Sequence, residues 1–414
     1  MSGQAISVLG LITLAAFAWG WGRLRGPAAI PWRLVVVGLG AQVVLAALML
    51  HLPPLRAALG ALGAGVDALA RATEQGTALV FGYLGGAPLP FAETAPGASF
   101  ILAFRALPLI LVVGALSALL YHLGVLPFLV RGMAALLSRG FGLGGAAGFA
   151  TAANVFVGMV EAPLLVRPWL ASLSRADLFV VMVAGLATIS GNTLAVYALF
   201  LRDVVPDAAG QLLAASLVSA PASVLVARLM LPVEPGQATH EAETPPKLYA
   251  GAMEAIVRGT ADGLAIMLGV IAALIVFVAL VALANMALVP LLGVTLQEIA
   301  AWAMVPVAWL MGIAPADVGE AARLLGLKVV INEFVAYLDF ASSGAALSER
   351  TRIILAWALC GFANPGSMGI LVGGLITLVP ERRAEIAALG PAAVVGGTLA
   401  CCMTGAAVGV LLPG

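Results

Sequence analysis

Two stretches of the chain decide the fold: NVFVGMVEAPLLV at residues 154–166 and VVINEFVAYL at residues 329–338. Each places one glutamate, Glu161 or Glu333, inside an otherwise apolar run, and the two glutamates lie 172 residues apart. A charge in apolar surroundings is costly unless it is paired or used. The two stretches therefore predict an internal repeat with a polar centre in each half.

The repeat extends beyond the glutamates. The helix that follows each stretch begins at a serine, Ser174 or Ser348, and is interrupted at matching depth by a polar break. The breaks are TISGN at residues 188–192 and FANPGS at residues 362–367, about 174 residues apart. Pairs of hairpins and broken helices of this kind form the substrate and ion sites of secondary transporters.

The composition identifies the bilayer as the solvent of this chain. Of its 414 residues, 62% are hydrophobic and 10% are charged, which leaves too little polar surface for a water-soluble domain. Apolar runs of about 20 residues recur, and a helix of that length crosses a hydrocarbon core of about 30 Å. The alternating pattern of a membrane barrel is absent from the sequence, so we expect the spans to be helices.

We predict an all-α polytopic membrane protein with about eight transmembrane helices, two re-entrant hairpins in an inverted repeat, and interfacial helices. Residues 55–83 carry charges at helical spacing and form one interfacial helix. The hairpins occupy residues 142–170 and 315–340. The predicted spans are 5–22, 34–51, 99–121, 176–201, 210–232, 263–288, 352–378 and 386–412.

This pattern divides the chain into five parts. Residues 1–124 form N-terminal scaffold helices with an interfacial helix. Residues 125–232 form the first repeat, with an interfacial helix, hairpin 1, broken helix 4 and helix 5. A cytoplasmic loop and connector at residues 233–262 leads to scaffold helix 6 at residues 263–288. Residues 289–414 form the second repeat, with an interfacial helix, hairpin 2, broken helix 7 and helix 8.

Basic residues give the orientation. They follow the odd-numbered spans, as at Arg23, Arg131 and Arg382, although Arg56 and Arg350 fall on the other side. Because basic residues are enriched in cytoplasmic loops, we predict a multi-pass protein of the bacterial cell inner membrane with both termini in the periplasm. An odd number of crossings separates the two halves, so the repeats are inverted relative to each other.

Simpler interpretations of the polar residues remain open. Glu161 paired with Arg167, or Glu333 paired with Lys328, would be a structural carboxylate. The asparagines beside the breaks would then be hydrogen bonders between packed helices. The matching positions of these residues in the two halves favour a binding site instead.

Several classes of function are excluded by the sequence. It contains no dinucleotide-binding motif after a strand, no phosphate-binding loop and no nucleophile elbow, so we expect no enzyme. Cys360, Cys401 and Cys402 lack the spacing of a zinc site or an extracellular disulfide. Twenty basic and twenty acidic residues balance, and we expect no nucleic-acid partner.

Five strings in the sequence resemble the concentrative nucleoside transporter family, whose members are cation-coupled nucleoside symporters. The strings NEFVAY and CGFAN, in this order, are specific to that family. The resemblance covers residues from about 128 to the C-terminus. It implies a homotrimer in the lipid bilayer, with nucleoside as the transported solute. The strings are GMVEAPLLVRPWL (158–170), EAIVRGTADGLAIML (254–268), LQEIAAWAMVPVAWLMG (296–312), GLKVVINEFVAYL (326–338) and CGFANPGSMGI (360–370).

The resemblance also implies site residues. Glu161 at the hairpin 1 tip would face the nucleobase, and Glu333, Asn364 and Ser367 would hold ribose hydroxyls. A sodium ion would lie between the hairpin 1 tip and the break in helix 4. Its ligands would be the Asn154 side chain, the Val157 carbonyl, the Thr188 side chain and the Ile189 carbonyl.

One departure from the family pattern concerns the base contacts. Where the family usually has Gly-Gln-Thr-Glu, this chain has Gly158, Met159, Val160 and Glu161. Loss of two hydrogen-bonding groups changes specificity, since each unmatched polar partner costs about 1–3 kcal/mol. The alternatives are therefore a modified nucleoside or a different solute, coupling to protons instead of sodium, or an uncoupled channel or sensor with the same fold.

Overall fold

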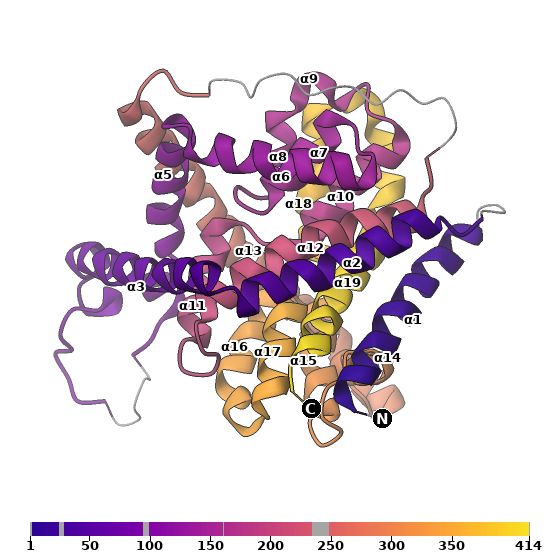
Figure 1. Cartoon of the computed structure of the whole chain (residues 1–414). Helices are drawn as coiled ribbons and strands as arrows, with labels where there is room; N and C mark the ends of the chain where they lie inside the picture. The colour runs from indigo at the N-terminus through magenta and orange to yellow at the C-terminus, as the bar shows by residue number, and fades with distance from the viewer. Residues whose placement is uncertain (1, 25–28, 94–98, 160, 234–247, 414) are drawn as a thin grey trace.

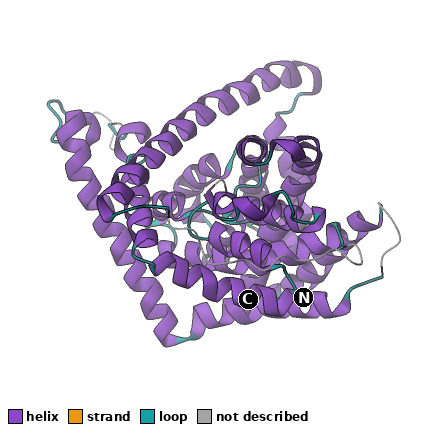
Figure 2. Ribbon diagram, turned by 90° about the horizontal axis from the view of Figure 1, so that it is seen from above, coloured by secondary structure: helices purple, strands orange, loops and turns teal. Residues whose placement is uncertain are grey.

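The computed structural model describes residues 2–24, 29–93, 99–159, 161–233 and 248–413. These residues form helices joined by short loops, and no strand occurs among them (Figure 2). Within this part of the chain, seven helical stretches are long and apolar enough to cross a membrane by length and composition. The protein is therefore a multi-pass, all-α membrane protein, as the composition predicts.

The N-terminal helices confirm the first three predicted spans and the amphipathic segment. A 29-residue helix, α3, occupies the place of the predicted interfacial helix, and most of its residues are exposed. The third span begins with a separate short helix, α4, because Pro108 precedes the longer helix α5. The elements are α1 (Gly3–Arg23), α2 (Trp32–His51), α3 (Pro53–Phe81), α4 (Leu102–Arg105), α5 (Leu109–His122) and α6 (Val125–Phe141).

The first repeat contains a hairpin and a helix in two pieces. The hairpin is divided among α7 (Gly145–Asn154), α8 (Glu161–Leu165) and α9 (Arg167–Leu170). Helices α10 (Arg175–Ala187) and α11 (Gly191–Leu201) replace a continuous span, and α12 (Ala208–Met230) follows.

Helix α13 (Ala252–Leu292) separates the repeats and has 41 residues, more than the predicted span at 263–288. The apolar run predicted only the part of α13 that is hydrophobic. Its first turns are polar and helical, with an ion pair between Glu254 and Arg258 four residues later, a spacing that stabilises helices.

The second repeat has the same order of elements. Helices α17 and α18 together occupy the predicted span at 352–378, and neither alone is long enough to cross a bilayer. The elements are α14 (Leu296–Leu310), α15 (Val318–Val330), α16 (Glu333–Ser343), α17 (Glu349–Leu359), α18 (Pro365–Leu378) and α19 (Arg383–Leu411).

The two halves match residue by residue in their broken helices. The side chains of Ser174 and Ser348 cap α10 and α17 by accepting hydrogen bonds from backbone N–H groups three residues later. Helices α10 and α17 begin 174 residues apart, and so do α11 and α18. Figure 1 shows α7, α8 and α9 at one end of the molecule and α15 and α16 at the other, so the hairpins enter from opposite ends.

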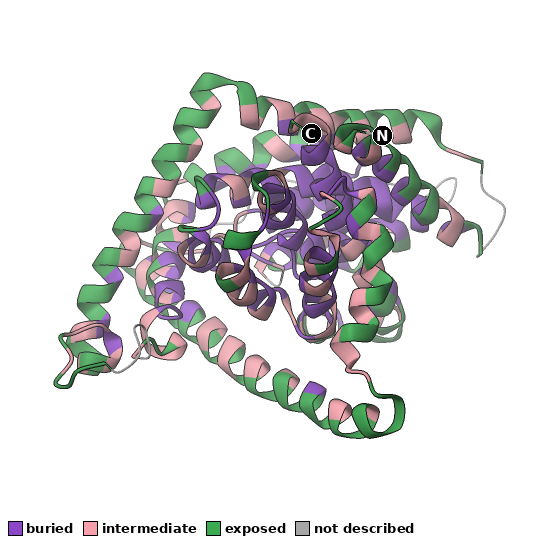
Figure 3. Ribbon diagram, turned by 90° about the horizontal axis from the view of Figure 1, so that it is seen from below, coloured by how far each residue is buried: buried purple, intermediate pink, exposed green. Residues whose placement is uncertain are grey.

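A buried centre holds these broken helices. Helix α10 packs against α12 and α19, and every residue of α10 from Ala176 to Ala187 is buried. By contrast, long stretches of α3 and α13 expose large apolar side chains, among them Leu79, Met286 and Leu291. Figure 3 shows these exposed peripheral helices around the buried centre. Such a surface suits contact with lipid or with other protein chains.

Candidate functional site

The hairpin 2 tip places Glu333 at the start of a helix. Asn332 caps α16 by accepting a hydrogen bond from the Val335 N–H at 2.9 Å, and Glu333 is the first residue of that helix. Only 5% of Glu333 is exposed. A carboxylate is favoured at this position, because helix N-termini carry partial positive charge.

Two other elements donate hydrogen bonds to the Glu333 carboxylate. The Tyr197 hydroxyl on α11 donates to Oε1 at 2.9 Å, and Asn364 Nδ2 at the break before α18 donates to Oε2 at 2.6 Å. The Asn364 Oδ1 atom in turn accepts from the Ser367 N–H at 2.9 Å. The structure thus brings Glu333, Asn364 and Ser367 together, and all three are buried.

Aromatic rings support this cluster. The ring centroid of Tyr197 lies 4.6 Å from that of Tyr337 and 5.6 Å from that of Phe334, both on α16. The Tyr337 hydroxyl donates to the Ala356 carbonyl on α17 at 2.8 Å. Sequence reasoning missed Tyr197. Its only signal was a tyrosine inside an apolar run two turns after a break, where a buried hydroxyl usually has a partner.

The hairpin 1 tip contacts the break in the first repeat. Gly191, the first residue of α11, donates its N–H to the Phe156 carbonyl at 3.0 Å. Gly158 has φ of +127°, and a Cβ there would lie 2.6 Å from Oε2 of Glu161, so the tip needs glycine. Glu161 is half-buried at the start of α8.

The two apolar residues that replace polar base contacts are only partly described. Met159 is half-buried and approaches Gly185 of α10, where an added Cβ would lie 3.1 Å from Met159 Cβ. Val160 lies outside the residues that the structure describes. The described part of the tip therefore presents an apolar side chain beside Glu161.

The residues expected to bind sodium lie at two helix ends. Asn154 ends α7 and is 1% exposed, and neither its Oδ1 nor its Nδ2 has a hydrogen-bond partner among the described residues. Thr188 caps the end of α10, and its hydroxyl donates to the Ala184 carbonyl at 2.8 Å, which leaves the oxygen lone pairs available. Val157 is half-buried and Ile189 is fully buried.

This donor set fits a small hard cation. A buried amide without a partner is rare and calls for an explanation. Oxygen atoms at the C-terminal ends of half-helices coordinate sodium in transporters with broken helices. The ends of α7 and α10 meet here, and their partial negative charges favour a cation.

The structural interpretation of Glu333 as the partner of Lys328 is not what the contacts show. Lys328 Nζ donates instead to the Ala358 carbonyl at 3.0 Å. A buried ion pair elsewhere, Asp177 with Arg228 at 2.5 Å, was missed by sequence reasoning. It joins the start of α10 to the end of α12 and fixes the packing of the first repeat.

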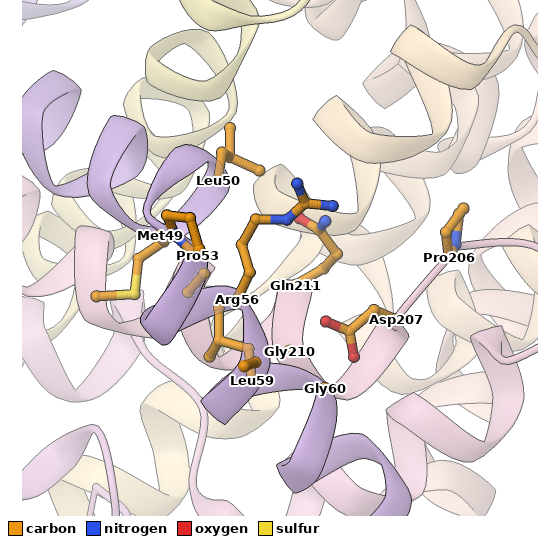
Figure 4. Close-up of a pocket in the computed structure, with 12 residues that line it drawn as sticks. Met49, Leu50, Pro53, Arg56, Leu59, Gly60, Pro206, Asp207, Gly210 and Gln211 are labelled. Atoms are coloured by element: carbon orange, nitrogen blue, oxygen red, sulfur yellow. The ribbon is translucent and has the colours of Figure 1, made fainter.

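A separate cavity of about 580 Å³ lies between the end of α2, the start of α3 and the start of α12 (Figure 4). Arg56, Asp207 and Gln211 supply its polar lining. Burial raises the pKa of the Asp207 carboxyl, against hydrogen bonding from Gly210 and the charge of Arg56. None of the expected substrate or sodium ligands lines this cavity, so it is distinct from the hairpin site.

Three family descriptions match the chain. The description "Na+ dependent nucleoside transporter C-terminus" matches residues 211–409, and the corresponding N-terminus description matches residues 9–84. A third, "Nucleoside recognition", matches residues 103–203. Together they cover both repeats and the N-terminal helices.

Individual proteins match over nearly the whole chain. An uncharacterised transporter of Haemophilus influenzae is 37% identical over 98% of this chain and 97% of its own length. Nucleoside permease NupC of Helicobacter pylori is 33% identical, with coverage of 98% and 97%. The structure of CNTnw in an inward-facing, substrate-bound state superposes with a TM-score of 0.88 at 37% identity and covers 98% of both chains.

Proposed function

The chain belongs to the concentrative nucleoside transporter family, and from that premise we propose that it imports nucleosides by symport with sodium. The observation that carries the proposal is the cluster of Glu333, Asn364 and Ser367 where hairpin 2 meets the broken helix. Transport by alternating access follows from the inverted repeats, since one repeat rocks against the scaffold around a central site.

The ribose is held by the Glu333 cluster. A carboxylate accepts hydrogen bonds only, and the two hydroxyl groups of a ribose are donors that suit it. Tyr197 and Asn364 hold the carboxylate oxygens in place in the absence of substrate. When a sugar binds, its hydroxyl groups complete the remaining lone pairs, and Ser367 adds a second polar contact.

The nucleobase lies at the hairpin 1 tip, beside Glu161. Met159 and Val160 give this side of the site two apolar contacts where a hydrogen-bonding pair is usual for the family. A less polar base edge, as in a modified nucleoside, suits these contacts best. A different ribosyl-like solute is the second candidate that the same substitution favours.

Sodium binds with the side chains of Asn154 and Thr188 and the carbonyls of Val157 and Ile189. The unpartnered amide of Asn154 supports this assignment, because a proton-coupled site has no need of an extra oxygen ligand there. The hydrogen bond from Gly191 to the Phe156 carbonyl joins the tip to the break. An ion bound at this junction therefore orders the tip against which the base packs, and that links the two cargoes.

The wider organisation remains part of the proposal. The scaffold comprises residues 1–124 and 263–288, the repeats comprise 125–232 and 289–414, and residues 233–262 connect them. The exposed apolar faces of α3 and α13 suit a homotrimer in the bilayer. The basic loops place both termini in the periplasm of a bacterium, with the chain in the inner membrane.

Thermal unfolding of the purified protein tests this function directly. A ligand that binds the folded state raises the melting temperature by mass action. We expect a nucleoside panel that includes uridine, adenosine and base-modified analogues to raise it in sodium chloride and much less in choline chloride. Equal shifts in the two salts would count against sodium. No shift with any nucleoside would direct attention to another solute.

A further inference from the structure

Lys328 is a buried cation that the proposed transport cycle does not yet use. It lies in the last turn of α15, is 2% exposed, and donates from Nζ to the Ala358 carbonyl near the end of α17. A lysine buried at membrane depth is costly, and such residues are usually retained for a function. The question is why the second repeat holds a fixed positive charge at this point.

The repeat relation identifies the matching position in the first half. Helices α10 and α17 begin 174 residues apart, so Ala358 corresponds to Ala184. The Ala184 carbonyl accepts from the hydroxyl of Thr188, which is one of the proposed sodium ligands. The two equivalent carbonyls therefore contact a sodium ligand in one half and an ammonium group in the other.

The hairpins give the same correspondence. With Glu161 set on Glu333, Lys328 falls at Phe156, between the proposed sodium ligands Asn154 and Val157. The first repeat has at this junction a buried amide without a partner. The second repeat has the ammonium group of Lys328.

Electrostatics require a positive charge in both halves. In the first repeat, the C-terminal ends of α7 and α10 meet, and in the second the C-terminal ends of α15 and α17 meet. The partial negative charges of such ends favour a cation. The charge of Lys328 also acts on the Glu333 carboxylate, which sits across the hairpin 2 tip.

We propose that Lys328 is a tethered cation, whose ammonium group holds in the second repeat the position that a free sodium ion holds in the first. Because one of the two positions is filled covalently, transport couples to one free cation per substrate. Lys328 is then a positioning residue that orders the hairpin 2 tip and Glu333 for the ribose. This inference rests on the proposed sodium-coupled function.

The test is the sodium dependence of uridine binding, measured by calorimetry on purified protein in detergent. For the unmodified protein, we expect the logarithm of affinity to rise with the logarithm of sodium concentration, below saturation, with a slope of about 1 for one linked ion. A slope near 2 would overturn the proposal without any variant. A protein that binds no uridine in sodium would instead overturn the proposed function.

The variant Lys328→Asn gives the second repeat an amide like that of Asn154. We expect it to bind uridine about tenfold or more weakly at low sodium, a loss of about 1.4 kcal/mol. High sodium should restore the affinity, with a slope above 1, because a second free ion replaces the ammonium group. If the variant loses affinity but keeps the original slope, Lys328 has only a structural role and the proposal fails.

Trp357→Phe is the matched control. Trp357 is buried on α17 next to Ala358, and its Nε1 donates to Gln211 Oε1 at 2.7 Å. The substitution removes a buried hydrogen bond near the same carbonyl but no charge. We expect a lower melting temperature with an unchanged sodium slope, which separates loss of stability from loss of the tethered cation.

Discussion

Glu333 is held by donors from two other helices, Tyr197 on α11 and Asn364 before α18. This arrangement joins the two repeats at one carboxylate, because Tyr197 belongs to the first repeat and Asn364 to the second. Both partners donate, so the carboxylate keeps its remaining lone pairs for substrate. The charge and acceptor character of Glu333 are therefore its essential properties at this site.

The first prediction concerns Glu333→Gln. A glutamine has one acceptor oxygen in place of two and no charge, so it cannot accept from Tyr197, Asn364 and two ribose hydroxyls. We expect uptake of radiolabelled uridine to fall about 100-fold or more, since charge-assisted hydrogen bonds contribute about 1.5–3 kcal/mol each.

Tyr197→Phe is the control for this variant, because it removes one donor and leaves the carboxylate charged. It should reduce uptake much less than Glu333→Gln does. Both variants should elute from gel filtration like the unmodified protein. Near-normal uptake by Glu333→Gln would contradict the assignment of this residue to the ribose.

A second prediction concerns Met159, beside Glu161. The variant Met159→Gln restores a hydrogen-bonding group at the hairpin tip. We expect affinity for unmodified nucleosides to rise about fivefold, because one net hydrogen bond contributes about 1 kcal/mol. Competition by a nucleoside panel against labelled uridine measures the change. An unchanged order of competitors would show that Met159 does not face the base.

At this scale the sequence predicted the members of the ribose cluster but not their partners. Glu333, Asn364 and Ser367 carry family strings, and the structure brings them together. Tyr197 lies 136 residues from Glu333, and only the folded chain reveals such a contact. The role of Val160 stays a prediction.

At the scale of elements, the breaks in the helices were predictable because polar and glycine residues interrupt long apolar runs. The structure places the first break at residues 188–190 and the second at 360–364, the latter beginning two residues before the predicted string. The length of α13 was not predictable from hydropathy, since its first turns are polar. Capping and ion pairs within the helix extend it beyond the apolar run.

The third prediction addresses the junction of α7 with the first break. Asn154→Ala removes one side-chain oxygen from the proposed ion site and leaves both half-helices intact. We expect the sodium concentration that gives half-maximal uridine binding to rise about tenfold or more, a change of about 1.4 kcal/mol. Melting curves in a sodium titration measure it. Unchanged sodium dependence would place the ion elsewhere.

A fourth prediction concerns the base of hairpin 2, where Asp317 precedes α15. Its carboxylate accepts from the Ser348 hydroxyl at 2.6 Å and from the Ser348 N–H at 3.1 Å. Burial raises the pKa of Asp317, but hydrogen bonds from Ser348 and Thr351 outweigh it, and the pKa lies below the ordinary value of 3.8. The carboxylate thus ties the hairpin to the cap of α17.

Because the pKa of Asp317 is lowered in the folded protein, its stabilisation is present above pH 3.8 and is lost as pH falls below that value. Asp317→Asn should therefore lower the free energy of unfolding by about 1 kcal/mol at pH 7. The difference from the unmodified protein should shrink as the pH is lowered toward 3.8 in melting experiments. A constant difference across this range would exclude the ionised carboxylate as its cause.

At the scale of the whole molecule, the two hairpins enter from opposite ends while the chain ends lie together (Figure 1). Arg350 fixes that end of the molecule. Its guanidinium donates to the Gly312 carbonyl, to the Ser7 hydroxyl and to carbonyls at Gly409, Leu412 and Pro413. The first helix, the entry to hairpin 2 and the last helix are thereby joined, which provides a fixed frame around the central site.

Composition alone predicted the membrane class and the inverted arrangement at this scale, because they depend on apolar run lengths and charge positions. Which faces meet other chains depends on surfaces that hydropathy does not distinguish from lipid-facing ones. The exposed apolar residues of α3 and α13 are compatible with both uses. The homotrimer consequently stays a proposal.

Uridine uptake into proteoliposomes under an imposed inward sodium gradient tests the central claim most directly. Sodium-coupled symport predicts transient accumulation of labelled uridine above its external concentration, which collapses when gramicidin dissipates the gradient. An imposed proton gradient in choline should produce no accumulation. Uridine that only equilibrates across the membrane, at the same rate with or without the sodium gradient, would contradict the account.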